Sequence, residues 1–182
     1  MRVDIIIWNI VRFLVIPKIV FYRIFFWIHF PLGSIIYGTP KIRNGKLIQL
    51  WKGFQLWRLC RMNGKIHIWQ NFFMNEFGTI SAWIKEESQI QIWDNVMIWP
   101  LFYMISQDHG FKSWETFSNS TSWRKSTIKI GDNVWIWARV TILKWVTIWD
   151  NVVIWAGSVV TKDIPTNSVA VWNPCKKIKE VR

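Results

Sequence analysis

Hydrophobic residues return at every sixth position over most of this chain. Residues 130–165 read as six consecutive hexads: IGDNVW, IWARVT, ILKWVT, IWDNVV, IWAGSV and VTKDIP. Each hexad opens with an aliphatic residue, and a small or β-branched residue follows four places later. A helix repeats near 3.6 residues and a simple strand near 2. A sustained period of six therefore predicts a solenoid whose units bury one face by stacking on their neighbours.

The same period runs through the preceding part of the chain. Aliphatic or Met residues stand at 50, 56, 62, 68, 74, 80, 92, 98 and 104, and Glu86 breaks the series. The predicted inward residues four places later are Phe54, Cys60, Ile66, Phe72, Gly78, Ile84, Ile90, Val96 and Phe102. We interpret Cys60 as a small buried hydrophobic residue rather than a reactive thiol. Together the two blocks hold about sixteen hexads.

A polar stretch separates the two blocks. Met104 and Ile130 are 26 residues apart, which is not a multiple of six. The intervening sequence DHGFKSWETFSNSTSWRKST is rich in Ser and Thr, so we predict a loop excursion over residues 108–127. Loops that project from a rigid scaffold often carry the function of a solenoid.

The N-terminal residues have a different pattern. Residues 1–36 are apolar and aromatic, but Arg12, Lys18 and Arg23 interrupt them, so no window predicts a clean membrane-spanning helix. A signal peptide is disfavoured because the charges recur and no small-residue cleavage site follows. We predict a separate, helical segment over residues 1–45 that lies on a membrane surface. The alternatives are a helix that caps the solenoid or packs on a partner subunit, and, less favoured, a true anchor.

Charge and cysteine content narrow the class of partner. The chain has 23 Lys and Arg against 11 Asp and Glu, a formal charge of +12, which favours a phosphorylated cofactor, an acidic membrane surface or nucleic acid. The basic residues are dispersed and no known nucleic-acid module is visible, so we do not expect nucleic acid as a partner. Two cysteines make no disulfide framework. We therefore expect a cytoplasmic protein, peripheral at the inner face of the membrane.

Residues 128–177 resemble a known repeat family. The segments NVWIW, LKWVTIWD and AVWNP are similar to the motifs NVWIG, LKGVTIGD and AVGNP of the maltose, galactoside and polysaccharide O-acetyltransferases. The resemblance covers about residues 48–178. It implies a left-handed parallel β-helix over residues 46–182 with a short C-terminal tail, with three hexads in each coil and so roughly five coils. It also implies a homotrimer that uses acetyl-CoA.

Trp occupies many positions where this family has Gly. It follows the aliphatic residue of eight hexads, at positions 51, 57, 69, 93, 99, 137, 149 and 155, and we call these eight residues the ladder Trp. Trp145 and Trp172 replace family glycines outside that register. Coil corners often need conformations that Gly adopts cheaply, so we expect strain at these positions. Our hypothesis is that most of these Trp are Gly in the living protein. A genome in which UGA encodes Gly, translated with a table in which UGA encodes Trp, would give this pattern. The alternative is an aromatic ladder on the outer faces.

Two residues match the catalytic positions of the family. His109, in SQDHGF, matches the catalytic histidine, and an imidazole that titrates near neutrality can take the proton from an attacking hydroxyl. Asn75, in FFMNEF, matches an asparagine beside that histidine, and its amide can donate a hydrogen bond to a developing oxyanion. A surface-loop histidine and a turn asparagine are the simpler structural interpretations.

The resemblance also assigns the cofactor residues. Ala138 and Ala156, one coil apart, are implied to contact the pantetheine arm, and Trp135 walls the acyl pocket or stacks on the outside of a coil. Toward the nucleotide end of CoA lie Thr161, Lys162 and Lys176, and the two ammonium groups suit its phosphates. We expect no metal site, since His29, His67 and His109 lack the arrangement that a carbonic anhydrase of this fold needs.

These residues predict an enzyme that transfers an acetyl group from acetyl-CoA to a hydroxyl of a sugar or surface-glycan precursor. The expected route is direct attack, with His109 as the base. Two alternatives stay open. One is an acyltransferase that uses another acyl-CoA, such as succinyl-CoA, and the other is a non-catalytic solenoid that binds partners through its flat faces.

Overall fold

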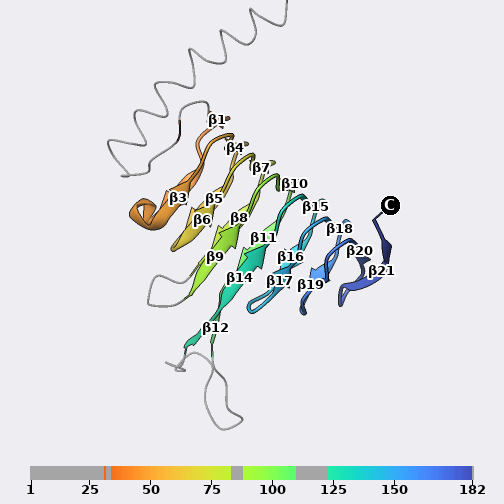
Figure 1. The fold of residues 1–182 in the computed structure, drawn as a ribbon. Helices are drawn as coiled ribbons and strands as arrows, with labels where there is room; N and C mark the ends of the chain where they lie inside the picture. The colour runs from red at the N-terminus through yellow and green to blue at the C-terminus, as the bar shows by residue number, and fades with distance from the viewer. Residues whose placement is uncertain (1–30, 32–33, 83–87, 110–122, 182) are drawn as a thin grey trace, which may run out of the picture.

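The described residues of the computed structural model form one β-solenoid. The structure describes residues 31, 34–82, 88–109 and 123–181. Short parallel strands follow one another around the solenoid and build about six turns (Figure 1). The predicted all-β parallel solenoid is confirmed. The predicted helical segment lies in residues 1–45, most of which fall outside the described residues.

The parallel strands form three sheets that run along the solenoid, which we call faces A, B and C. Face A contains β3 (Ile48–Leu50), β6 (Ile66–Ile68), β9 (Gln89–Ile92), β14 (Thr127–Ile130) and β17 (Thr147–Ile148). Face B contains β1 (Ile35–Ile36), β4 (Gln55–Leu56), β7 (Phe73–Met74), β10 (Met97–Ile98), β15 (Val134–Ile136), β18 (Val152–Ile154) and β20 (Ser168–Val171), and β21 (Lys176–Glu180) adds to β20 as an antiparallel last strand. Face C contains β2 (Lys41–Arg43), β5 (Arg61–Asn63), β8 (Thr79–Ser81), β11 (Tyr103–Ile105), β16 (Thr141–Ile142) and β19 (Val159–Val160).

Three short elements complete the fold. A 3-10 helix, η1 (Gly45–Leu47), precedes β3. β12 (Gln107–His109) and β13 (Trp123–Lys125) pair with each other in a separate two-stranded antiparallel sheet. Among the described residues no helix combines the length and apolar character that crossing a bilayer requires.

The solenoid begins before the predicted boundary at residue 46. β1 pairs with β4 on face B, and β2 pairs with β5 on face C, so both belong to the repeat. These two strands and β3 make a first turn. The predicted number of roughly five coils is therefore wrong by one turn, because the hexad pattern was counted only from Leu50.

Each turn is stacked on the next in a fixed register. Ile130 pairs with Ile148, 18 residues further on. Ile68 pairs with Ile92 and Ile92 with Ile130, although these pairs are 24 and 38 residues apart. The additional residues fall between β8 and β9 and between β11 and β14, where the chain passes from face C to face A, and the pairing resumes unchanged. The hexad with Glu86 therefore adds no rung, and Ile84 and Glu86 lie outside the described residues.

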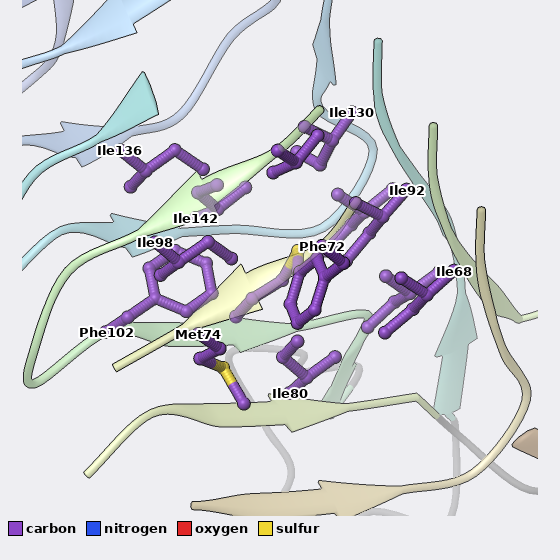
Figure 2. Close-up of a cluster of buried hydrophobic side chains, with 14 of the residues drawn as sticks. Ile68, Phe72, Met74, Ile80, Ile92, Ile98, Phe102, Ile130, Ile136 and Ile142 are labelled. Carbon is purple, nitrogen blue, oxygen red and sulfur yellow. The ribbon is translucent and has the colours of Figure 1, made fainter. Parts of the chain in front are cut away.

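The interior of the solenoid is filled by the residues that the hexad pattern predicted. In β6, for example, Ile66 and Ile68 are buried while His67 between them is half-buried and faces outward. Figure 2 shows Phe72, Met74, Ile80 and Phe102 from neighbouring turns meeting in this core. The predicted inward residues that the structure describes are all buried, including Cys60 and Ser158.

The turns between faces A and B contain asparagines in the left-handed backbone region. Asn71, Asn95, Asn133 and Asn151 have φ between 55° and 60°. Asn tolerates this region better than most residues. The amides also form hydrogen bonds from turn to turn, with Asn71 Nδ2 3.0 Å from Asn95 Oδ1 and Asn133 Nδ2 2.9 Å from Asn151 Oδ1. At this edge, Asn therefore suits both the left-handed backbone of the turn and the hydrogen bonding between stacked turns.

The ladder Trp are not strained in the way that the sequence analysis predicted. All eight are described, and none of them has a positive φ. Six of them stack on a ladder Trp of a neighbouring turn, with ring centroids 5.2 Å apart for Trp51 and Trp69 and 5.1 Å apart for Trp69 and Trp93. The prediction of strained corners at these positions is wrong, because in each of these eight hexads the left-handed residue stands two places after the ladder Trp.

Trp145 and Trp172 do occupy conformations that favour glycine. Their φ angles are 63° and 87°, and both side chains are more than half exposed. A bulky residue in this region costs about 1–2 kcal/mol because its Cβ crowds the following carbonyl. The Lys144 ammonium lies over the Trp145 ring, 4.3 Å from its centroid, but an exposed indole ring gains less from packing than a buried one. Leu59, Phe77, Leu101 and Arg139 hold the same left-handed region, so the backbone angles distinguish Gly from Trp neither at these two positions nor at the ladder Trp.

We expect Trp145→Gly and Trp172→Gly each to raise the free energy of unfolding by about 1 kcal/mol, because each removes a strained residue. Urea denaturation measures the change. Trp135→Gly is the matched control: this Trp lies within β15, where Gly weakens a strand, so its free energy of unfolding should fall. A loss of stability in all three variants would contradict the strain at Trp145 and Trp172.

The hypothesis of UGA-encoded glycine predicts Gly at positions 137, 149 and 155 of the protein made in its natural host. Peptide mass spectrometry of that protein reads these positions directly. UGG codons at all three positions would show the hypothesis to be wrong.

Candidate functional site

The backbone of His109 lies where the chain leaves the solenoid between faces C and A. β12 and β13 project from this edge as an antiparallel pair, with His109 opposite Trp123 (Figure 1). The base of the predicted loop is thus a short β-ladder, because two strands that leave the coil side by side can pair with each other. Beneath it the buried Ser126 donates its hydroxyl to the Ser106 carbonyl at 2.6 Å. That bond joins the two segments of chain next to β12 and β13, at the base of the antiparallel pair that carries His109.

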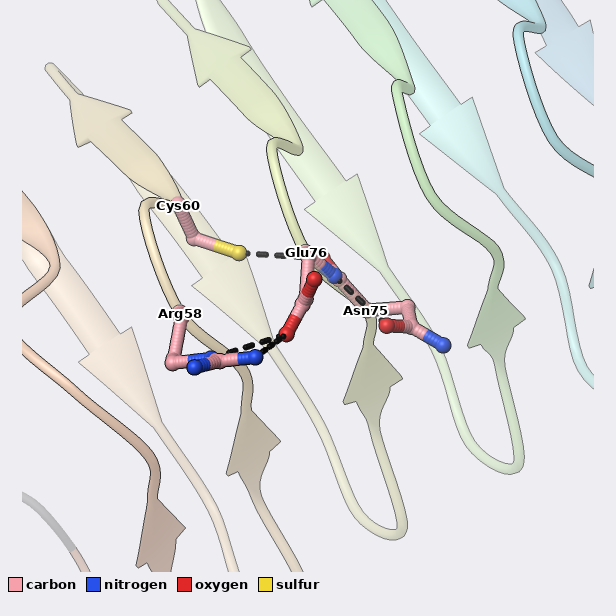
Figure 3. Close-up of polar contacts among 4 residues, drawn as sticks. All are labelled: Arg58, Cys60, Asn75 and Glu76. Atoms are coloured by element: carbon pink, nitrogen blue, oxygen red, sulfur yellow. Dashed lines mark hydrogen bonds and ion pairs between the residues drawn. The ribbon is translucent and has the colours of Figure 1, made fainter.

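Asn75 lies at a different edge, between faces B and C. It follows β7, and its side chain is half-buried. Its backbone N–H donates to the Ile98 carbonyl at 2.9 Å, and its carbonyl accepts the Cys60 thiol at 3.0 Å. Its Oδ1 accepts the Glu76 N–H at 2.7 Å. The contacts with Ile98 and Cys60 therefore hold Asn75 between neighbouring turns. Figure 3 shows the contact with Cys60 and the contact with Glu76, the next residue in the same turn.

An ion pair flanks Asn75. The Arg58 guanidinium contacts Glu76 Oε1 through both Nε and one terminal nitrogen, at 2.9 Å each. The Phe77 N–H also donates to the Arg58 carbonyl at 3.2 Å. These contacts join two successive turns at this edge. Sequence spacing gave no signal for this cluster, because Arg58 and Glu76 become neighbours only when one turn stacks on the next.

Cys60 is fully buried beneath this edge. Burial raises the pKa of its thiol to about 11, and the negative charge of Glu76 acts in the same direction. The thiol therefore stays protonated at neutral pH and can donate its hydrogen bond to Asn75. The prediction of a small buried residue at Cys60 is confirmed, and the hydrogen bond is an addition that sequence spacing gave no signal for.

The proposed pantetheine residues lie along the same edge as Asn75. Ala138 and Ala156 follow β15 and β18 on successive turns, and the Gly157 N–H donates to the Ala138 carbonyl at 2.9 Å. Ala156 is exposed and Ala138 half-buried, so backbone is accessible there. Trp135 faces outward from β15, with its ring 4.7 Å from that of Trp137. It lies on the outer surface of face B, where either of its predicted roles is open.

The proposed nucleotide-end residues are divided between two edges. Thr161 and Lys162 follow β19 at the edge between faces C and A, and both are exposed. Lys176 begins β21, where it pairs with Val171 at the edge between faces B and C, and it is also exposed. Within one chain the candidate residues thus form two groups. Asn75, Ala138, Ala156 and Lys176 share one edge, and His109, Thr161 and Lys162 share another.

The other described histidine is a poor candidate for catalysis. His67 lies in the middle of β6, opposite Gln49 and Gln91 of the neighbouring strands. Burial lowers the pKa of its imidazole, and the charge of Lys65 lowers it further. Among the residues that the structure describes, no group of three His, Cys, Asp or Glu side chains could hold a metal ion.

Comparisons with known proteins match this same solenoid. Residues 127–162 match the family model described as bacterial transferase hexapeptide (six repeats). The galactoside O-acetyltransferase of Escherichia coli (strain K12) is 40% identical over 121 residues, which are 64% of this chain and 54% of that protein. A crystal structure of a maltose O-acetyltransferase from Clostridium difficile 630 is similar with 34% identity and a TM-score of 0.58, covering 83% of this chain and 68% of that one. A galactoside acetyltransferase in complex with coenzyme A has 29% identity and a TM-score of 0.57, covering 82% and 64%.

The hexads and the parallel solenoid define a protein of the hexapeptide-repeat class. Within that class the chain belongs to the hexapeptide-repeat O-acetyltransferase family and resembles the galactoside and maltose O-acetyltransferases. The resemblance stated from the sequence motifs is confirmed. The chain spans about half the length of the curated relatives it matches, at 54% and 59% for the first two.

The Cys60 pKa predicts how stability depends on pH. The pKa of the Cys60 thiol is ordinarily 9.0 and is raised to about 11 in the fold. At a pH between these two values, the unfolded chain loses the thiol proton while the folded chain keeps it. Stability is therefore lost as pH rises through this window. We expect the free energy of unfolding of the wild type to fall further than that of Cys60→Ala between pH 9 and pH 11, measured by urea denaturation. Equal slopes for the two proteins would contradict a raised pKa.

Proposed function

We propose that this protein transfers an acetyl group from acetyl-CoA to a hydroxyl of a sugar or surface-glycan precursor. Membership of the O-acetyltransferase family is the observation that carries this proposal. The excess of basic residues suits the anionic cofactor and fits the proposed position of Lys162 and Lys176 at its nucleotide end. In a related galactoside acetyltransferase the bound molecule is coenzyme A.

The proposed reaction is a direct attack on the thioester. The imidazole of His109 takes the proton of the acceptor hydroxyl as its oxygen bonds to the acetyl carbonyl carbon. The carbonyl oxygen becomes an oxyanion, to which the Asn75 amide donates a hydrogen bond. The carbon–sulfur bond then breaks, and the imidazolium returns its proton to the CoA sulfur. No covalent enzyme intermediate forms, and the products are an acetyl ester and CoA.

Assembly into a homotrimer brings the two groups of candidate residues together in this proposal. His109 and Asn75 lie at different edges of one solenoid, so a single chain offers each site only half of its residues. In a threefold assembly, the edge of one subunit between faces C and A meets the edge of the next subunit between faces B and C. Three equivalent sites then form, each between two subunits.

The remaining proposals concern the handedness and the cellular position of the solenoid. We propose that it winds in the left-handed sense of the family that the hexads resemble. We further propose a cytoplasmic enzyme whose apolar and basic N-terminal residues contact the inner face of the membrane, close to a glycan precursor. The sequence predicted this segment as residues 1–36, but Ile35 and Ile36 form β1 of the solenoid, so the proposed membrane contact ends before them. The solenoid domain then follows this segment. The predicted excursion over residues 108–127 ends before Thr127, which begins β14 on face A.

The central test is His109→Ala. Loss of a general base should lower kcat for acetyl transfer by about 100- to 10,000-fold, while the trimer measured by light scattering stays intact. The assay follows release of the CoA thiol with a panel of sugars that includes maltose and a β-galactoside. His67→Ala is the matched control and should keep wild-type kcat. Full activity in His109→Ala would overturn the assignment of His109 as the general base. A preference for succinyl-CoA over acetyl-CoA would show that the acyl donor is not acetyl-CoA.

The lysine assignment has a separate test. We expect Lys162→Ala and Lys176→Ala each to raise the KM for acetyl-CoA about three- to tenfold with little change in kcat. Each substitution removes an exposed ammonium group that is proposed to contact a phosphate of CoA. Lys41→Ala, an exposed lysine on β2 in the first turn, is the control and should leave this KM unchanged. The effects should shrink at high salt. An unchanged KM for acetyl-CoA in both variants would show that the nucleotide end of CoA binds elsewhere.

A further inference from the structure

The backbone of Asn75 is fixed on both sides by neighbouring turns. Its N–H donates to the Ile98 carbonyl of the next turn at 2.9 Å. Its carbonyl accepts a hydrogen bond from the Cys60 thiol, at 3.0 Å, from the turn before. Cys60 is fully buried, so water cannot replace this bond easily. The thiol is therefore one of two restraints, with the Ile98 carbonyl, on the peptide that carries Asn75.

The Asn75 amide is also oriented. Its Oδ1 accepts the backbone N–H of Glu76 at 2.7 Å, and only an oxygen can accept at that position. The amide nitrogen must then lie on the opposite side, and Figure 3 shows it directed away from Cys60 and Arg58. The corner consequently presents Asn75 to its surroundings as a hydrogen-bond donor.

The ion pair keeps the nearest competing acceptor away from that amide. The Glu76 carboxylate follows Asn75 directly in the chain and could accept from its nitrogen. Instead Arg58 holds Glu76 Oε1 through two contacts of 2.9 Å. The Arg58 side chain is 68% exposed, so this restraint is weaker than the buried thiol contact.

We infer that Cys60 is a positioning residue that holds Asn75 as a donor toward the acyl group, acting through the Asn75 carbonyl. This inference rests on the proposed function, in which Asn75 meets the oxyanion. An oxyanion contact needs a donor at a fixed distance, and a small displacement weakens it strongly. The protonated state of the thiol agrees with this role, because burial raises its pKa well above neutrality. A thiol so buried and protonated is unsuited to act as a nucleophile.

The experiment combines Cys60→Ala, Cys60→Ser, Asn75→Ala and the double variant Cys60→Ala/Asn75→Ala. Loss of the thiol bond should lower kcat for acetyl transfer about three- to tenfold with an unchanged KM for acetyl-CoA. Cys60→Ser keeps a donor of similar size and should restore most of kcat. In the Asn75→Ala background, Cys60→Ala should cause no further loss of kcat, because its effect passes through Asn75. Cys175→Ala, at the other buried cysteine, is the control and should keep kcat within about twofold.

A purely structural role of Cys60 gives a different result. If Cys60→Ala lowers kcat equally in the wild-type and Asn75→Ala backgrounds, or if Cys60→Ser is no better than Cys60→Ala, the inference is overturned. If the wild type transfers no acyl group, the proposed function fails. Crystal structures of Cys60→Ala and Cys60→Ser then decide the inference by themselves. It stands if Asn75 moves in the first and not in the second, and it falls if Asn75 keeps its place in both.

Discussion

The stacking register between turns is the constraint on which the whole structure depends. Each strand pairs with strands of the neighbouring turns at the same phase, so Ile130 lies on Ile148 and Ile92 lies under Ile130. Inward residues then form continuous columns in the core, and outward residues form columns on the faces and edges. A residue's column is thus fixed by its place in the hexad. Extra residues are accepted only where they leave the coil and return without changing this phase.

The columns explain how the candidate site is arranged. Asn75 and the peptides of Ala138 and Ala156 lie on one edge because each follows a strand of face B. His109 lies at another edge because the excursion starts after β11 of face C. In the proposed assembly, the candidate catalytic and cofactor residues, which are far apart on one solenoid, come together through a second copy of the same columns. The assembly that we propose follows from this geometry.

The same register decides where an unusual residue is tolerated. An indole in the ladder position extends from the edge and stacks on the indole of the next turn, as Trp69 does between Trp51 and Trp93. An indole two places further on, as at Trp145, meets the left-handed part of the corner. Asn occupies that place in several other hexads and adds hydrogen bonds between turns. The cost of a residue therefore depends on its phase in the hexad more than on its size.

The sequence alone determined the repeat, the buried columns and the positions of the family's motifs, because a period of six is a local property of the chain. It predicted burial of Cys60 and of the inward residues correctly. It failed at the first turn, where the pattern is too short, and at the ladder Trp, because corner angles cannot be read from periodicity. Only the tertiary structure joined Cys60, Arg58 and Glu76 around Asn75. These residues belong to successive turns, and their contacts exist only once one turn stacks on the next.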